Sequence, residues 1–217
     1  MTLDRRNTLL FLGLTAGQGL TGCAALNIAT RQPPRLFALS PKTTFEEGLP
    51  RSDAVVMVEA PSATAGLNTA RIALKPEPTL LEYYAAALWI DVVPVMVQNL
   101  VVESLDASRA VEAVSPAEAV GIRPDYGLRI HIREFQAEYD QGTDKPPLVN
   151  VRLQGRLLEM PRRRSIDTVS VQQMLRASGT SVDSVVLAYD ESLGKALKRL
   201  VEWTARTIDT APASEQG

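Results

Sequence analysis

The chain has 217 residues, of which 45% are hydrophobic and 22% are charged, and its formal net charge is −2. This balance excludes a disordered or fibrous protein, and the chain lacks the basic stripe that nucleic-acid binding requires. One cysteine and one histidine can form neither an internal disulfide nor a structural zinc site of the Cys/His type.

Residues 1–22 have the pattern of a lipoprotein signal peptide. Arg5 and Arg6 form a positive n-region, and the apolar stretch after them is too short and too broken by Gly and Gln to span a bilayer. Leu20-Thr21-Gly22-Cys23 then matches a lipobox, which predicts cleavage before Cys23 and acylation of this residue. The alternatives are an ordinary secretory signal with a chance cysteine and a buried structural cysteine.

The residues around the lipobox predict the route and the destination of the chain. The Arg5-Arg6 pair leaves both Sec and twin-arginine export open. Ala24, rather than an aspartate, follows the cysteine and favours the outer membrane, facing the periplasm. We expect a lipidated tether over residues 23–35, in which two adjacent prolines favour extended backbone, then a folded domain over 36–208 and a polar tail over 209–217.

The first half of the domain predicts short strands around one helix. Residues 36–39 are expected to form an edge strand, 54–60 a strand buried on both faces, and 70–74 a short strand. Residues 80–88 are ambiguous, because the tyrosines favour a strand and the alanines a helix. Asp91 is the expected N-cap of a helix over 91–107, with Pro94 in its first turn, and residues 110–114 follow as a further strand.

The second half predicts longer strands and a closing helix. Alternating apolar and polar residues indicate strands at 128–132 and 149–157, joined by a polar loop, and a third strand is expected near 165–174. The basic run Arg162–Arg164 is expected in a solvated turn. Ser181 is the expected cap of an amphipathic helix over 182–208. Together these elements predict an α+β fold, with a mixed, largely antiparallel sheet and two main helices packed on one face.

The same segments resemble a known family. The order of the lipobox, Phe37-Ala38-Leu39-Ser40-Pro41, Tyr83-Tyr84-Ala85-Ala86-Ala87-Leu88-Trp89 and the strand Leu128–Phe135 is similar to that of the ABC-type transport auxiliary lipoproteins. This family includes the lipoprotein subunit of the paraquat-inducible (Pqi) system. The resemblance covers nearly the whole chain after the signal peptide.

What the resemblance implies is an accessory role in transport. Such proteins accompany the permease and ATPase subunits of an ABC transporter and an MCE-domain protein, which move lipids or other hydrophobic compounds across the envelope. The family carries no catalytic residues over to this chain, and no cofactor or metal is expected. Assembly into a homo-oligomeric ring is compatible with the family. A stand-alone structural or assembly lipoprotein of the outer membrane is the alternative, with a hydrolase after it.

Tyr83, Tyr84 and Trp89 are the candidate contact site for a partner or a lipid, because aromatic residues are enriched at interfaces. The alternative is that Trp89 is a core anchor at a strand–helix junction.

His131 lies on the polar side of its strand, where an exposed histidine is favoured over a general base. No G-x-S-x-G elbow and no phosphate-binding loop occurs, so an ATP-driven step needs another subunit.

The lipobox generates a prediction about the anchor. We expect Cys23→Ser to leave the precursor uncleaved or the protein soluble, and to remove labelling by radioactive palmitate, because the thiol is the acceptor of the first acyl group. The measurement is labelling followed by membrane fractionation. Labelling that persists in the variant would contradict the lipobox interpretation.

Overall fold

The computed structural model describes residues 33–211. The predicted signal peptide, Cys23 and most of the tether lie outside the described residues, as do residues 212–217. The strands are β1 (Arg35–Phe37), β2 (Val55–Val58), β3 (Ser62–Ala63), β4 (Arg71–Glu77), β5 (Leu80–Trp89), β6 (Glu112–Val114), β7 (Tyr126–Glu138), β8 (Leu148–Glu159) and β9 (Arg164–Arg176), and the helices are α1 (Val93–Ser108) and α2 (Val182–Thr210).

Strand β7 is the centre of one mixed sheet of nine strands. Along one edge it pairs antiparallel with β8 over its whole length, and β8 pairs in turn with β9. Along the other edge it pairs in parallel with β2, then β3, then β4. The short edge strand β1 lies at one end of the path, parallel to β5, as the sequence predicts for an edge strand.

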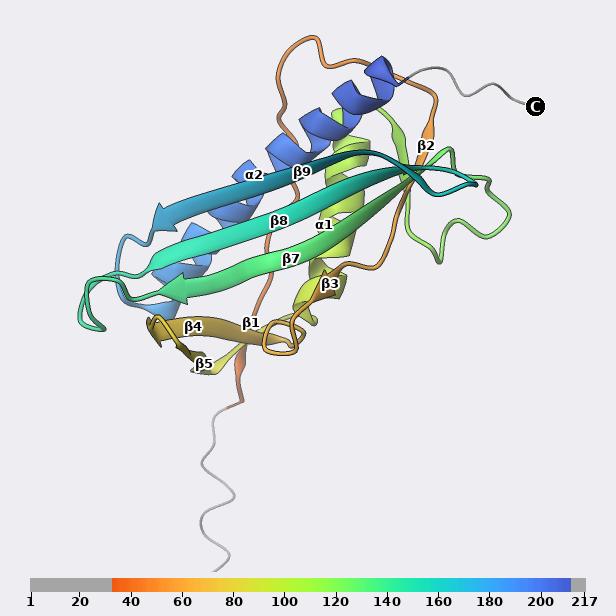
Figure 1. Cartoon of the computed structure of the whole chain (residues 1–217). Coiled ribbons are helices and arrows are strands. Elements are labelled where there is room, and N and C mark those ends of the chain that lie inside the picture. The colour runs from red at the N-terminus through yellow and green to blue at the C-terminus, as the bar shows by residue number, and fades with distance from the viewer. Residues whose placement is uncertain (1–32, 212–217) are drawn as a thin grey trace, which may run out of the picture. The chain divides into compact units, whose positions relative to one another are not determined.

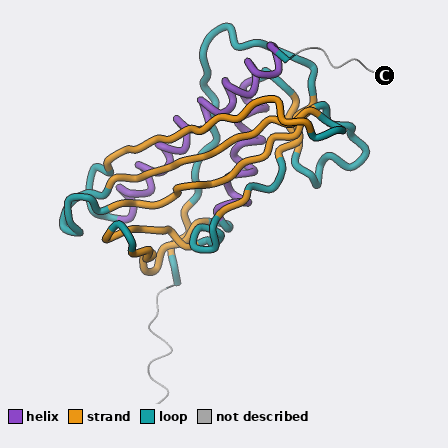
Figure 2. The backbone as a smooth tube through the Cα atoms, viewed as in Figure 1, coloured by secondary structure: helices purple, strands orange, loops and turns teal. Residues whose placement is uncertain are grey.

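Both helices pack on the same face of the sheet, behind the strands in the view of Figures 1 and 2. The predicted α+β fold with two helices on one face is therefore confirmed. The core lies in this layer, because alternate residues of β7 and β8 and one stripe of each helix point into it. The hydroxyl of Tyr189 on α2 is fully buried and donates to the carbonyl of Ala73 on β4 at 2.9 Å, which joins the last helix to the middle of the sheet.

The two helix starts differ in how well the sequence predicts them. Ser181 caps α2 as expected, since its Oγ accepts from the backbone N–H of Ser184 at 3.3 Å. The predicted N-cap Asp91 is wrong: the cap of α1 is Val92, without a side-chain cap bond. The Asp91 carboxylate lies one residue too early and accepts from the backbone N–H of Val92 at 2.7 Å, outside the first helical turn. Pro94 does occupy the first turn.

The ambiguous segment 80–88 is a strand, and tertiary pairing decides it. It forms β5, antiparallel to β4, and the register shifts by several residues between the Arg71–Leu88 and Ala73–Tyr83 pairs. Ala86 lies inside this shift with φ +52°, a backbone conformation that is uncommon for residues other than glycine. The irregularity turns the end of β5 so that Trp89 enters the core.

The described residues contain one continuous hydrophobic core. Every residue of the main buried cluster lies between Leu39 and Ile208, and the compact unit begins at Pro34. We therefore expect the chain from Pro34 onward to fold by itself. None of the helices in residues 33–211 is long and apolar enough to cross a membrane.

Two leucines on α2 form a matched test of the core. Leu193 is fully buried and Leu187, on the opposite side of the same helix, is 68% exposed. We expect Leu193→Ala to lower the free energy of unfolding by about 2–5 kcal/mol, because it leaves a cavity, and Leu187→Ala to change it by less than about 0.5 kcal/mol. Urea unfolding measures both values. Equal effects of the two substitutions would contradict this packing of α2.

Candidate functional site

The face of the sheet that carries no helix is lined by polar side chains of β7, β8 and β9. These residues alternate with the core residues along each strand and so point to the opposite side, except at the register shift between Ile132 and Glu134, where Arg133 and Glu134 follow one another. The antiparallel register places them directly beside one another. We call this surface the helix-free face; its members are Arg129, His131, Arg133, Glu134, Gln136 and Glu138 on β7, Asn150, Arg152, Gln154 and Arg156 on β8, and Thr168, Ser170, Gln172 and Met174 on β9.

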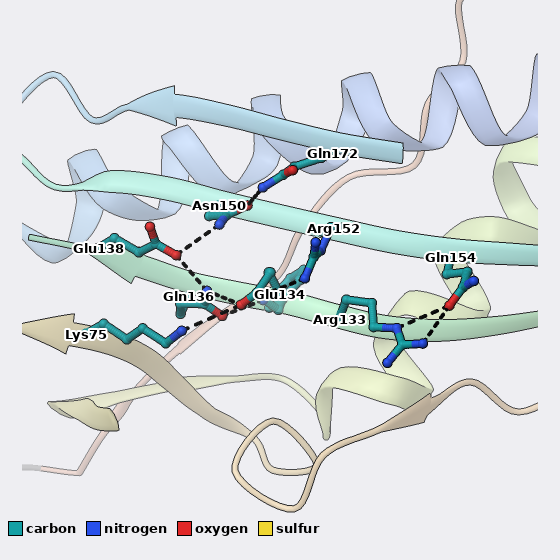
Figure 3. Close-up of polar contacts among 10 residues, drawn as sticks. Lys75, Arg133, Glu134, Gln136, Glu138, Asn150, Arg152, Gln154 and Gln172 are labelled. Atoms are coloured by element: carbon teal, nitrogen blue, oxygen red, sulfur yellow. Dashed lines mark hydrogen bonds and ion pairs between the residues drawn. The ribbon is translucent and has the colours of Figure 1, made fainter. Parts of the chain in front are cut away.

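Gln136 is the centre of a hydrogen-bonded network at one end of this face (Figure 3). Its side chain is 1% exposed, and its amide oxygen accepts from the backbone N–H of Phe135 at 2.8 Å. Its amide nitrogen donates to Glu134 at 2.6 Å and to Glu138 at 2.8 Å. Because a buried amide is costly unless its bonds are made, these three bonds hold the two carboxylates in a defined position.

The network continues across four strands. Glu134 accepts from Arg152 on β8 at 3.0 Å and lies 3.6 Å from the ammonium of Lys75 on β4. Asn150 on β8 donates to Glu138 at 2.9 Å and accepts from Gln172 on β9 at 2.9 Å. The Nε of Arg152 is buried and makes no hydrogen bond to a described residue. Within residues 33–211, no group of three or more His, Cys, Asp or Glu side chains could hold a metal ion.

The other end of the helix-free face carries an excess of arginine. Arg129 and Arg156 are direct cross-strand neighbours, so their like charges repel one another. Glu59 offsets part of this repulsion, because its carboxylate accepts from Arg129 at 3.0 Å and from Arg163 at 2.7 Å. Arg133 instead holds the amide oxygen of Gln154, at 2.8 Å and 3.1 Å. Neither Arg133 nor Arg156 forms an ion pair in the described part of the chain.

His131 lies between these two ends and contacts a serine. Its Nδ1 is 2.7 Å from the Oγ of Ser62 on β3. Partial burial, and then the positive charge of Arg133, lower the pKa of His131. Among residues 33–211 no carboxylate hydrogen-bonds to the ring, so the Ser–His pair lacks the third group that orients a catalytic imidazole. The arrangement matches the polar strand histidine expected from the sequence.

The aromatic candidates Tyr83, Tyr84 and Trp89 lie at different depths. Trp89 is 1% exposed and packs edge-on against Phe135 and Tyr189, with ring centroids 6.0 Å and 5.1 Å away. It is therefore a core anchor at the β5–α1 junction, the alternative that the sequence left open.

Tyr83 and Tyr84 are half-buried and hydrogen-bonded. The Tyr83 hydroxyl donates to the carbonyl of Gly66 at 3.0 Å, and the guanidinium of Arg71 lies 3.8 Å from its ring centroid. The Tyr84 hydroxyl contacts that of Tyr139 at 2.9 Å. Burial, and then the Tyr139 contact, raise the pKa of Tyr84 above its ordinary value. Both side chains stay partly accessible at the β4–β5 hairpin.

Two small hollows open on the described surface. One, of about 210 Å³, is lined by Lys75, Glu77, Glu138, Tyr139 and Asp140 with two prolines of β4 and the β4–β5 turn. The other, of about 220 Å³, lies between the ends of β8, β9 and α2. Both are smaller than the roughly 300–1,000 Å³ of a usual small-molecule pocket.

The chain is similar to one known protein family and to several solved structures. The family model for the ABC-type transport auxiliary lipoprotein component matches residues 37–201. The chain belongs to this family. A solved structure from Xanthomonas campestris is similar to it at 24% identity with a TM-score of 0.75, covering 81% of this chain and 97% of that one. A second structure, of an uncharacterized protein, has 14% identity and a TM-score of 0.60, covering 82% and 99%.

For this auxiliary lipoprotein the family match supports the assignment to a family, and the solved structures support the fold. A structure from Chlamydia trachomatis, titled a hypothetical protein, is similar at 9% identity with a TM-score of 0.50, covering 74% of this chain and 100% of that one. At such identities these structures show the shared fold alone. No curated protein is a significant match. The family is one of transport auxiliary lipoproteins and not of enzymes.

The sequence did not predict the hydrogen-bonded network around Gln136. The alternation of β8 predicts that Asn150 points away from the core, but the alternation of Leu128, Ile130 and Ile132 would direct Gln136 toward it. The register shift between Ile132 and Glu134 reverses the phase of β7, and both amides become buried on the helix-free face. The one local signal is that Glu-x-Gln-x-Glu, at 134–138, places three polar groups in one row of a strand. The partners Lys75, Arg152 and Gln172 come from three other strands and needed the tertiary structure.

His131 is the only histidine of the chain, so its titration is easily assigned. We expect an NMR titration midpoint below about 6.5 and a rise toward that value in Arg133→Gln, because the neutralised side chain no longer opposes protonation. Since the pKa is lower in the folded state, stability falls as the pH drops below about 6.5. Arg206→Gln, remote from β7, is the control. A midpoint unchanged by Arg133→Gln would contradict the assigned contact.

Proposed function

We propose that this chain is a membrane-anchored accessory subunit of an ABC transport system of the MCE type, which moves lipids or other hydrophobic compounds across the envelope. The observation that carries the proposal is the family match over residues 37–201. The lipobox ending at Cys23 supports a lipid anchor on the periplasmic side of a membrane, and Ala24 favours the outer membrane.

In this proposal the energy of transport comes from other subunits. The sequence has no phosphate-binding loop, which fits a chain that docks onto the permease, the ATPase or an MCE-domain protein. The hollows of about 210 Å³ and 220 Å³ are small for a lipid. We therefore propose that a single copy does not enclose the cargo and acts as a scaffold beside it.

The helix-free face is the proposed docking surface for the protein partner. Its charges are held in position by the Gln136 network, and Arg133 and Arg156 are without carboxylate partners in residues 33–211. An acidic surface on the partner would relieve the Arg129–Arg156 repulsion. Tyr83 and Tyr84, at the β4–β5 hairpin, are proposed to add contacts to a partner or a lipid, whereas Trp89 is buried in the core.

Co-purification tests this proposal. We expect the full-length, anchored chain, solubilised from membranes, to recover an MCE-domain protein or a permease subunit encoded near its gene. The double variant Arg133→Glu/Arg156→Glu should lower the recovery by roughly tenfold, because it replaces attraction by repulsion at the interface. Quantitative mass spectrometry of the purified fraction is the measurement.

Arg199→Glu is the matched control, because Arg199 is an exposed arginine on α2, on the other side of the sheet. It should leave the recovery unchanged. Recovery of an outer-membrane barrel instead of transporter subunits would favour the assembly lipoprotein. Loss of recovery by Arg199→Glu to the same extent would remove the helix-free face as the docking surface.

A further inference from the structure

Two connections meet at one end of the sheet, and together they form a surface that the helix-free face does not include. The β6–β7 loop, residues 115–125, lies beside the β8–β9 turn, residues 160–163 (Figures 1 and 2). The backbone N–H of Met160 donates to the carbonyl of Asp125 at 2.8 Å, and Tyr126 pairs with Glu159. We call these two connections the loop tip.

The loop tip presents aliphatic side chains to solvent. Val120 is 85% exposed, the highest value among the large exposed hydrophobic side chains of the described residues, and Ile122 is 39% exposed. The loop is held by its own hydrogen bonds: the backbone N–H of Ala119 donates to the carbonyl of Ser115 at 2.9 Å, and Glu118 accepts from the Ser115 N–H at 2.8 Å. The exposed Val120 is therefore part of an ordered turn.

Both connections of the loop tip also carry exposed arginines. Arg123 and Arg162 are exposed and form no ion pair in residues 33–211, and Arg163 and Arg129 share the single carboxylate of Glu59. The charged residues of the two connections are Arg123, Arg162 and Arg163 against Glu118 and Asp125. Both carboxylates accept backbone hydrogen bonds, Glu118 from Ser115 and Asp125 from Val55, each at 2.8 Å.

With three arginines and two carboxylates the loop tip has a formal charge of +1, although the chain as a whole is at −2. Exposed aliphatic side chains beside exposed arginines are a combination with which peripheral proteins enter a lipid headgroup layer: the apolar side chains reach the acyl boundary and the guanidinium groups bind phosphate. A protein interface would be expected to offer aromatic anchors, and residues 115–125 and 160–163 contain none.

We propose that the loop tip is a second membrane contact, which docks onto a bilayer that contains anionic phospholipid. The inference rests on the proposed function in one respect, that the chain works at a membrane. With the Cys23 anchor it fixes the domain at two points, so that the helix-free face keeps a set orientation toward its partner. The loop tip by itself binds weakly and reversibly, since two aliphatic side chains bury little apolar area.

Vesicle binding by the domain from Pro34 onward tests the proposal without the anchor. We expect sedimentation with vesicles of phosphatidylcholine and about 30 mol% phosphatidylglycerol, and roughly tenfold weaker binding to pure phosphatidylcholine or in about 0.5 M salt. Val120→Asp/Ile122→Asp and Arg123→Glu/Arg162→Glu should each weaken binding by roughly tenfold. Leu187→Asp and Arg199→Glu, at exposed positions on α2, are the matched controls.

A single introduced thiol locates the contact. The domain from Pro34 onward contains no cysteine, so Val120→Cys can be labelled with an environment-sensitive dye. Its emission should shift to the blue on anionic vesicles, and that of Leu187→Cys should not. Equal binding to both vesicle types, equal loss in the α2 controls, or no shift at position 120 would overturn the proposal. Vesicle binding without recovery of transporter subunits would instead contradict the proposed function alone.

Discussion

Strand β7 pairs with four other strands, and this pairing fixes which face of the sheet the helices cover and which face stays polar. On one side β8 is bonded to it from end to end, and on the other side β2, β3 and β4 take successive stretches. A strand bonded on both edges cannot slip by one residue without exchanging its apolar and polar faces. Leu128, Ile130 and Ile132 therefore fix which face the helices cover.

The opposite face is polar, yet part of it is closed to water. Gln136 and Asn150 are almost fully buried. Gln136 is satisfied within its own strand, by Glu134, Glu138 and the Phe135 N–H, and Asn150 by Glu138 on β7 and Gln172 on β9. Such a network is worth little as net stability, because the groups also bond well to water when the chain is unfolded. Its consequence is positional: Glu134, Glu138 and Arg152 are held at set places on a flat surface.

The two faces of the sheet therefore differ in chemistry: one is apolar and covered by the helices, and the other is polar. One face of the sheet is used for folding, and the other displays ordered charges from rigid strands, which suits recognition of a protein better than enclosure of a ligand. The loop tip is a third surface, formed by two connections and not by the sheet. Separation of these surfaces is what the proposed contacts with a protein partner and with a membrane would require.

The sequence by itself determined the lipobox, the family resemblance, the two helices and the buried faces of the strands near 128–132 and 149–157, because these depend on periodicity and on short local patterns. It placed the cap at Ser181 correctly and the cap at Asp91 one residue early, since a carboxylate can bond to its own neighbour as well as to a helical turn. The conformation of β5 was undecided because its tyrosines favour a strand and its alanines a helix. Pairing with β4 makes it a strand.

Only the tertiary structure decided which side chains meet. The Gln136 network joins residues of β4, β7, β8 and β9, and the loop tip joins two connections that are more than thirty residues apart in the chain. It also placed Trp89 in the core, because the irregular register of β5 rotates this residue toward Tyr189. Long-range contacts of this kind leave no trace in local periodicity, since each partner obeys only the pattern of its own strand.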